Sequence, residues 1–184
     1  MILAPKFWMV IDVESVGLHG EGFAVGWVVV GYDGVVVEEC RLCVSPDDAR
    51  GTASGREWVE ANCPVSAQSL CRSVADLRRT FWSRWREWKG RGAALVADCG
   101  WPVEARFLAA CVDDRPEVRE WEGPYPLHEL ASILLASGAD PLKERDRLPN
   151  ELPVHDPLAD ARQSARLLCE AVKRLKSIPS GEIK

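Results

Sequence analysis

Long apolar runs are missing from the 184-residue chain, since no stretch of about 18 apolar residues, the length of a membrane span, occurs in it. The opening residues, MILAPKF, lack the charged segment, apolar stretch and cleavage site of a secretion signal, so we expect none. An excess of basic residues is also missing, because the net charge is −5. This charge disfavours holding nucleic acid by bulk attraction, although bound divalent ions could supply the positive charge that phosphates require.

Cysteines in a disulfide or zinc-finger pattern are lacking too. The seven cysteines are odd in number and show no framework spacing, which favours reduced thiols and a cytoplasmic location. Cys40 and Cys43 form a CxxC, but without a second pair or a nearby histidine cluster this disfavours a zinc site. Length and an apolar content of 47% predict one domain over residues 1–184, with a core at about 6–176 and a short tail at 177–184.

Two acids, Asp12 and Glu14, close the short apolar run Phe7–Ile11, which is typical of a buried strand. Residues two apart in a strand point to the same face, so both carboxylates leave it in one direction. Such a pair is costly beside a core unless a cation lies between the charges, and hard oxygen ligands suit Mg²⁺ or Mn²⁺. Two solvated acids on an exposed edge strand are the alternative interpretation of so short a motif.

Periodicity and turn residues predict the other elements. We expect a loop over Ser15–Gly22, strands over Ala24–Val30 and Val35–Val44, a loop over Ser45–Gly55, a helix from about Ser66 to Lys89, a strand over Ala93–Ala97, helices over Trp101–Val112 and Leu127–Ser137, a loop over Ala139–Leu152, and a last helix from about Asp156 to Lys176. This order predicts an α/β fold whose mixed sheet has three antiparallel strands plus parallel strands, flanked by helices. A right-handed crossover would place Ala97–Asp98 beside Asp12 and Glu14.

The last predicted helix opens with the sequence HDPLAD. Asp156 suits the N-cap, Pro157 the first helical position, and Asp160 the second turn, where it could face the sheet. Together with Asp12 and Glu14, Asp160 would form a cage for two divalent ions about 4 Å apart, which suits attack on a phosphodiester. His155 could act as the general base near neutral pH, or it could simply be a loop histidine with a surface contact.

Three segments, DVESVGL, LVADCGWPVEARFL and HDPLADARQSARLL, resemble the motifs of the DEDDh exonucleases, the group of ribonuclease T and the polymerase III proofreading subunit. The resemblance covers roughly residues 6–175. It implies a ribonuclease H-like fold and removal of nucleoside monophosphates from single-stranded RNA or DNA 3′ ends with two Mg²⁺ or Mn²⁺ ions. It assigns the metal to Asp12, Glu14 and Asp160, the base to His155, and the grip on the terminal nucleotide to Val13, Ser15, Gly17 and Leu18.

The middle motif departs from the family pattern, which has an aspartate in the first turn of a helix. In this register the chain carries Glu104, with Phe107 and Leu108 behind it, while Asp98 lies earlier, at the end of a predicted strand. Either acid could be the remaining metal ligand, and the register slightly favours Glu104. A helix N-terminal acid for Glu104 and a strand-end cap for Asp98 are the structural alternatives. Trp101, between them, could contact substrate or support the helix start.

A basic, tryptophan-rich stretch runs from Arg72 to Arg91 and includes Trp82, Trp85 and Trp88. These side chains could stack on bases and neutralise phosphates, or form a subunit interface in a homodimer. The pattern most favours an amphipathic helix with tryptophans packed on the sheet and arginines in solvent.

Two further functions compete with the exonuclease hypothesis. A catalytically inactive nucleic-acid-binding or regulatory module would keep the fold without turnover. An endonuclease of the ribonuclease H type would share the acids, although the histidine five residues before Asp160 favours the exonuclease. No membrane partner is expected.

Overall fold

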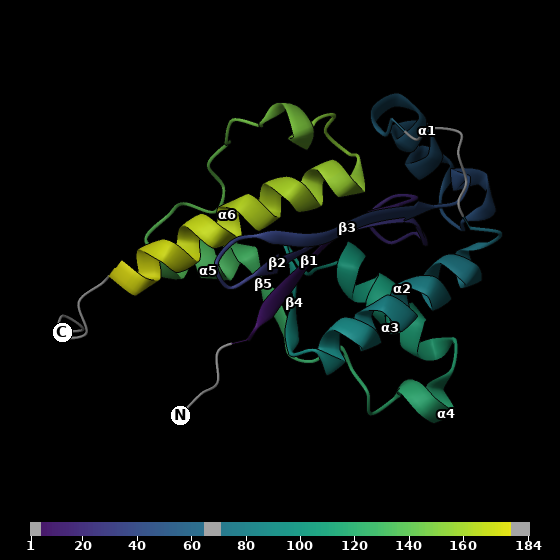
Figure 1. The fold of residues 1–184 in the computed structure, drawn as a ribbon. Coiled ribbons are helices and arrows are strands. Elements are labelled where there is room, and N and C mark those ends of the chain that lie inside the picture. The colour runs from purple at the N-terminus through teal and green to yellow at the C-terminus, as the bar shows by residue number, and fades with distance from the viewer. Residues whose placement is uncertain (1–4, 65–70, 178–184) are drawn as a thin grey trace.

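The computed structural model describes residues 5–64 and 71–177, and the chain order of its elements can be followed in Figure 1. The strands are β1 (Phe7–Ser15), β2 (Gly22–Gly31), β3 (Val36–Cys43), β4 (Ala93–Ala97) and β5 (Leu127–Glu129). The helices are η1 (Pro46–Asp48), α1 (Ala53–Asn62), α2 (Val74–Gly90), α3 (Val103–Asp113), α4 (Pro116–Arg119), α5 (Leu130–Ala136), η2 (Pro149–Glu151) and α6 (Pro157–Ser177), the two η elements being 3₁₀ turns. None of the helices within the described residues is long and apolar enough to cross a membrane.

The sheet has the strand order β3-β2-β1-β4-β5, which puts β1 at its centre. β1 pairs antiparallel with β2 and parallel with β4, and β5 adds a second parallel pair. This arrangement confirms the prediction of an α/β fold with a mixed sheet. It also contradicts the edge-strand interpretation of the acidic pair, because the strand that carries Asp12 and Glu14 has a neighbour on each side.

Helices cover both faces of the sheet, with α5 and α6 on one side and α2 and α3 on the other (Figure 1). Alternate residues of β1 pack into the two hydrophobic cores, one on each face of the sheet. Met9 and Ile11 pack in the cluster of α2 and α3, whereas Val10 packs in the cluster of α5 and α6. The all-apolar run of β1 is thus explained by burial of a central strand on both faces.

Three predicted elements need correction. Residues 66–70 of the first predicted helix lie outside the described residues, and α2 begins at Val74, where the Ser73 hydroxyl accepts a hydrogen bond from the amide of Asp76. Leu127–Glu129, predicted as helix, forms β5, because pairing with β4 at the sheet edge overrides helical spacing. The predicted loop Ser45–Gly55 contains η1 and the first turn of α1.

The tryptophans of α2 are part of the core. Trp82, Trp85 and Trp88 are between 2% and 4% exposed, so they cannot offer faces to nucleic-acid bases. This confirms the prediction that they pack on the sheet. The prediction that the arginines are solvated is wrong for Arg78, which is buried and ion-paired.

Candidate active site

The acidic pair lies where β1 ends beneath the start of α6. Asp12 is opposite Gly26 in the pairing of β1 with β2, and a Cβ on Gly26 would lie 2.3 Å from the carbonyl carbon of Pro157. Since real Cβ atoms essentially never approach that closely, glycine at this position lets the first turn of α6 rest on the sheet. This close approach brings the start of α6 onto the strand end that carries the acids.

The start of α6 fixes His155 and Asp160. The Asp156 carboxylate caps the helix by accepting hydrogen bonds from the amides of Leu158, at 3.1 Å, and Ala159, at 3.0 Å. The amide of His155 donates a hydrogen bond to Asp160 Oδ2 at 3.0 Å. His155 has φ 63°, the one positive value for a non-glycine residue in the described ranges. Such a left-handed backbone conformation is uncommon outside glycine.

The geometry brings three of the predicted residues to one point. One donor atom each from Glu14, His155 and Asp160 lies within 4.8 Å of the other two. Such carboxylate oxygens and an imidazole nitrogen form a donor set that a divalent cation can use. The fold therefore brings together residues that lie far apart in the sequence, while their role as ligands stays a prediction.

Burial disfavours the ionised form of the carboxylates in the acid cluster. Desolvation, with the charges of Glu104, Glu14, Asp160 and Asp98, raises the pKa of Asp12 well above its ordinary value. Burial and the charge of Asp160 raise the pKa of Glu14 to about 8. A group of buried carboxylates that repel one another in this way is relieved by bound positive charge.

Both candidates for the middle acid belong to the cluster. Glu104 stands in the first turn of α3 and is 7% exposed, and burial, together with the charge of Asp98, raises its pKa to about 7 against backbone hydrogen bonds that lower it. Asp98 follows β4 directly, and its side chain is more exposed. Parallel pairing of Ile11 with Ala97 explains its position beside Asp12. The choice between the two acids stays open.

Three neighbours of the cluster were not foreseen from the sequence. The guanidinium of Arg147 forms an ion pair with Asp160, the thiol of Cys63 lies 3.7 Å from Glu14 Oε2, and the ring of Trp58 meets that of His155 edge to face, with centroids 4.9 Å apart. Trp58 and Cys63 come from α1 and its C-cap. The Thr52 hydroxyl, an N-cap that accepts from the Gly55 amide, is the sequence signal that could have revealed this helix.

A groove of about 1310 Å³ extends from Glu14 between α1, α3 and the loop after β1. Its lining includes four predicted substrate-binding residues, Val13, Ser15, Gly17 and Leu18. Trp58 and Arg106 line its walls, whereas Trp101 is not part of it; that side chain is 68% exposed and borders a separate hollow beside β5.

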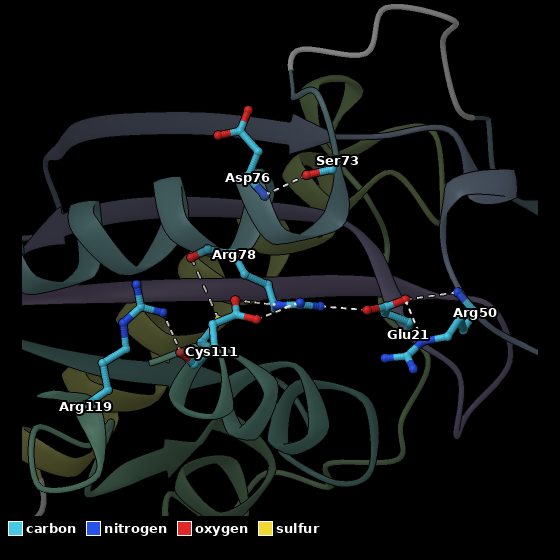
Figure 2. A network of polar contacts seen from close by, with 8 residues as sticks. Glu21, Arg50, Ser73, Asp76, Arg78, Cys111 and Arg119 are labelled. Atoms are coloured by element: carbon cyan, nitrogen blue, oxygen red, sulfur yellow. Dashed lines mark hydrogen bonds and ion pairs between the residues drawn. The ribbon is translucent and has the colours of Figure 1, made fainter. Parts of the chain in front are cut away.

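An ion-pair network, which Figure 2 shows, joins residues that line this groove: Glu21, Arg50, Arg78 and Asp114. Arg78 of α2 donates to Glu21 at 2.7 Å and, through two nitrogens, to Asp114 at 2.8 Å. The Arg50 amide donates to Glu21 at 3.1 Å. Burial would raise the pKa of Glu21, but these hydrogen bonds from Arg50 and Arg78 lower it below its ordinary value. The network ties the loop after β1 to α2 and to the end of α3.

Comparisons with known proteins place the fold. No family model matches the chain, and no curated protein matches it at a significant level. Among solved structures, it is similar to E. coli ExoI in a zinc-bound complex with ssDNA, with a TM-score of 0.61 and 12% sequence identity. The match covers 95% of this chain and 42% of that chain, so this protein spans less than half the length of ExoI. The likeness shows that this chain shares a fold with part of ExoI, and in this chain that fold is a five-stranded mixed sheet flanked by helices.

Proposed function

We propose that the chain is a metal-dependent 3′–5′ exonuclease that hydrolyses phosphodiester bonds at the 3′ ends of single-stranded RNA or DNA and releases nucleoside 5′-monophosphates. The observation that carries the proposal is the meeting of donor atoms from Glu14, His155 and Asp160 within 4.8 Å, beside the half-buried Asp12. The likeness in fold to ExoI, whose structure holds ssDNA and zinc, supports a nuclease.

In this proposal the acids hold two Mg²⁺ or Mn²⁺ ions. The ligands are Asp12, Glu14 and Asp160, with Glu104 or Asp98 as the middle acid. Bound ions of this kind supply positive charge for the phosphate and for the attacking and leaving oxygens. The cluster fits them, because the raised pKa values of the half-buried Asp12 and the buried Glu14 show that these carboxylates need such charge to ionise.

His155 is the proposed general base. Its ring packs against Trp58, which restricts its orientation, and its donor atom reaches the same point as Glu14 and Asp160. From there it can accept the proton of an attacking water at neutral pH. Val13, Ser15, Gly17 and Leu18 then hold the terminal nucleotide in the groove, and Trp101 is proposed to contact the strand outside it.

The test is digestion of single-stranded RNA and DNA carrying either a 3′ or a 5′ label, with Mg²⁺, with Mn²⁺ and with chelator. We expect release of mononucleotides from the 3′ end, loss of activity in chelator, and a fall of roughly 100-fold or more in kcat for His155→Ala. His19→Ala is the matched control for loss of an imidazole, because His19 lines the groove but is not one of the residues whose donor atoms meet in the cluster, and it should leave kcat unchanged.

Two outcomes would contradict the proposal. Cleavage of a closed circular strand would show an endonuclease of the ribonuclease H type. Absence of divalent-ion binding in a calorimetric titration, with and without a nucleoside monophosphate, would favour the inactive nucleic-acid-binding or regulatory module. The single domain, the cytoplasmic location and a homodimer remain predictions.

A further inference from the structure

Arg147 places a fixed positive charge on the acid cluster. Its guanidinium pairs with Asp160 Oδ1 and also donates to the carbonyl oxygen of Glu151 at 2.9 Å. The arginine side chain is 20% exposed and that of Asp160 is 13% exposed, so the pair is largely shielded from water. Because the amide of His155 occupies Asp160 Oδ2, both oxygens of this carboxylate are engaged by the protein itself.

The loop that carries Arg147 is held firmly against α6. Arg166 of α6 donates a hydrogen bond to the carbonyl oxygen of Asp146 at 3.0 Å and pairs with the buried Glu151. Glu151 in turn accepts a hydrogen bond from the amide of Leu148 at 2.9 Å. These contacts flank Arg147 on both sides, so the backbone at this position is held against α6 and presents the guanidinium at the cluster.

A divalent cation and this guanidinium need the same oxygen. An ion coordinated by Asp160 Oδ1 would lie at about 2.0–2.6 Å from it, a position that the guanidinium excludes while its hydrogen bond persists. Like charges also repel at such separations in a shielded site. Cation entry is therefore opposed by Arg147, and a phosphate brought next to the cluster is a ready alternative partner for an arginine.

We infer that Arg147 is an internal counter-ion that competes with the divalent cation for Asp160 and transfers to a phosphate of the bound strand. This inference rests on the proposed function and deepens it. Cation binding and strand binding would then strengthen one another. A bound phosphate draws Arg147 away from Asp160 and so frees the carboxylate for the cation, and a bound cation displaces Arg147 and so frees it for the phosphate. Such coupling is reciprocal by thermodynamic necessity.

The test compares Mn²⁺ affinity of the chelator-stripped full chain, by calorimetry, with and without saturating dTMP or AMP. In the wild type we expect the nucleotide to tighten Mn²⁺ binding roughly five- to tenfold. In Arg147→Gln we expect Mn²⁺ to bind tighter by a similar factor without nucleotide, and the nucleotide to add little. Arg162→Gln is the matched control, because Arg162 pairs with Glu39 and donates to the Asn150 carbonyl outside the cluster, and it should behave as wild type.

The same measurements remain informative if Arg147→Gln is less stable than the wild type. If Arg147→Gln unfolds in chelator, the rise of its Tm with Mn²⁺ concentration still reports its affinity, since ligand binding stabilises the folded state. Arg147→Lys, which keeps one charge, should lie between wild type and Arg147→Gln. Equal or weaker Mn²⁺ binding by Arg147→Gln without nucleotide overturns the inference alone, provided that the wild type binds the ion. A wild type that binds no divalent ion overturns this inference and the proposed function together.

Discussion

Single residues decide which acid completes the cluster. Glu104 is more deeply buried than Asp98, and its charge acts on Asp12 more strongly than that of any other neighbouring acid. We therefore predict that Glu104→Gln lowers kcat by roughly 100-fold or more, while Asp98→Asn lowers it about tenfold or less, a range typical of losses around a metal site. Single-turnover digestion of a 3′-labelled strand measures both effects.

The converse ranking would assign the middle position to Asp98. Asp113→Asn provides a control for the loss of one negative charge on α3, because Asp113 lines the groove beyond the acids and should leave kcat within about twofold, as surface changes usually do. Unchanged activity in both Glu104→Gln and Asp98→Asn would remove the need for a fourth carboxylate.

The raised pKa values of the cluster also predict how stability depends on pH without metal. Burial, with neighbouring charge, raises the pKa of Glu14 to about 8 and that of Glu104 to about 7. Each group holds its proton more tightly in the folded chain than in the unfolded chain, where its pKa is about 4.3. The stability contributed by these protons is complete below about pH 4 and is lost as pH rises toward the folded values.

In chelator we therefore expect Tm to fall between about pH 5 and pH 8, and Mg²⁺ to restore it most strongly at the upper end. Differential scanning calorimetry measures both effects. Glu14→Gln should flatten the fall in chelator, because the glutamine has no proton to lose. A Tm that rises over this range without metal would contradict the interaction of these carboxylates.

Individual site residues could be predicted from the sequence where their partners lie close to them in the chain. Asp12 and Glu14 are two residues apart on a strand, and His155 and Asp160 frame one helix start, so spacing alone indicated that each pair has a common direction. Arg147 and Cys63 carry no such pattern. They reach Asp160 and Glu14 through a loop and through α1, whose positions result from tertiary packing that periodicity does not encode.

At the scale of elements, the loop before α6 depends on one buried carboxylate. Glu151 is 2% exposed, and Arg166 donates to it at 2.6 and 2.9 Å. Burial would raise the pKa of Glu151, but these hydrogen bonds and that from Leu148 lower it below its ordinary value. We predict that Glu151→Gln lowers the free energy of unfolding by about 2–3 kcal/mol, because charged hydrogen bonds are lost inside the protein.

Glu170 provides the matched control, since it also pairs with Arg166, at 3.2 Å, but from an exposed position. Glu170→Gln should cost about 0.5 kcal/mol or less. Urea unfolding with Mg²⁺ present compares the two variants. Equal losses would show that the buried carboxylate does not anchor the loop.

Elements were predictable where burial and periodicity agreed. β1 and α6 each bury a continuous apolar face, and their predicted bounds lie close to those observed. α1 was missed because it buries only Gly55 and Val59 and follows a stretch rich in turn residues. The packing of α1 requires glycine at position 55, because a Cβ there would lie 2.7 Å from the Val16 carbonyl oxygen. β5 was missed because three residues at a sheet edge acquire their conformation from the neighbouring strand.

The molecule as a whole combines an acidic charge of −5 with a groove that has basic side chains at its walls. Most arginines of α2 are engaged by acids of this chain: Arg78 by Asp114, Arg84 by Glu38 and Arg86 by Glu122. They are therefore poor candidates for phosphate contacts. Arg106, exposed on α3, lines the groove instead, and no ion pair of its side chain is found within residues 5–64 and 71–177.

This distribution predicts that Arg106 is one of the arginines that determine the salt dependence of strand binding. Each phosphate that is neutralised releases counterions, so log Kd changes with log salt in proportion to the number of contacts. In a His155→Ala background, which should slow degradation of the strand, Arg106→Ala should reduce the slope by about one and weaken binding regardless of base sequence. Arg86→Ala removes the same charge from the core-packed helix and should leave the slope unchanged. Fluorescence anisotropy of a labelled single strand over a salt series measures both slopes.

A slope that falls with Arg86→Ala and not with Arg106→Ala would place the bound strand on α2 and not in the groove, because counterion release counts only the phosphates that the protein neutralises.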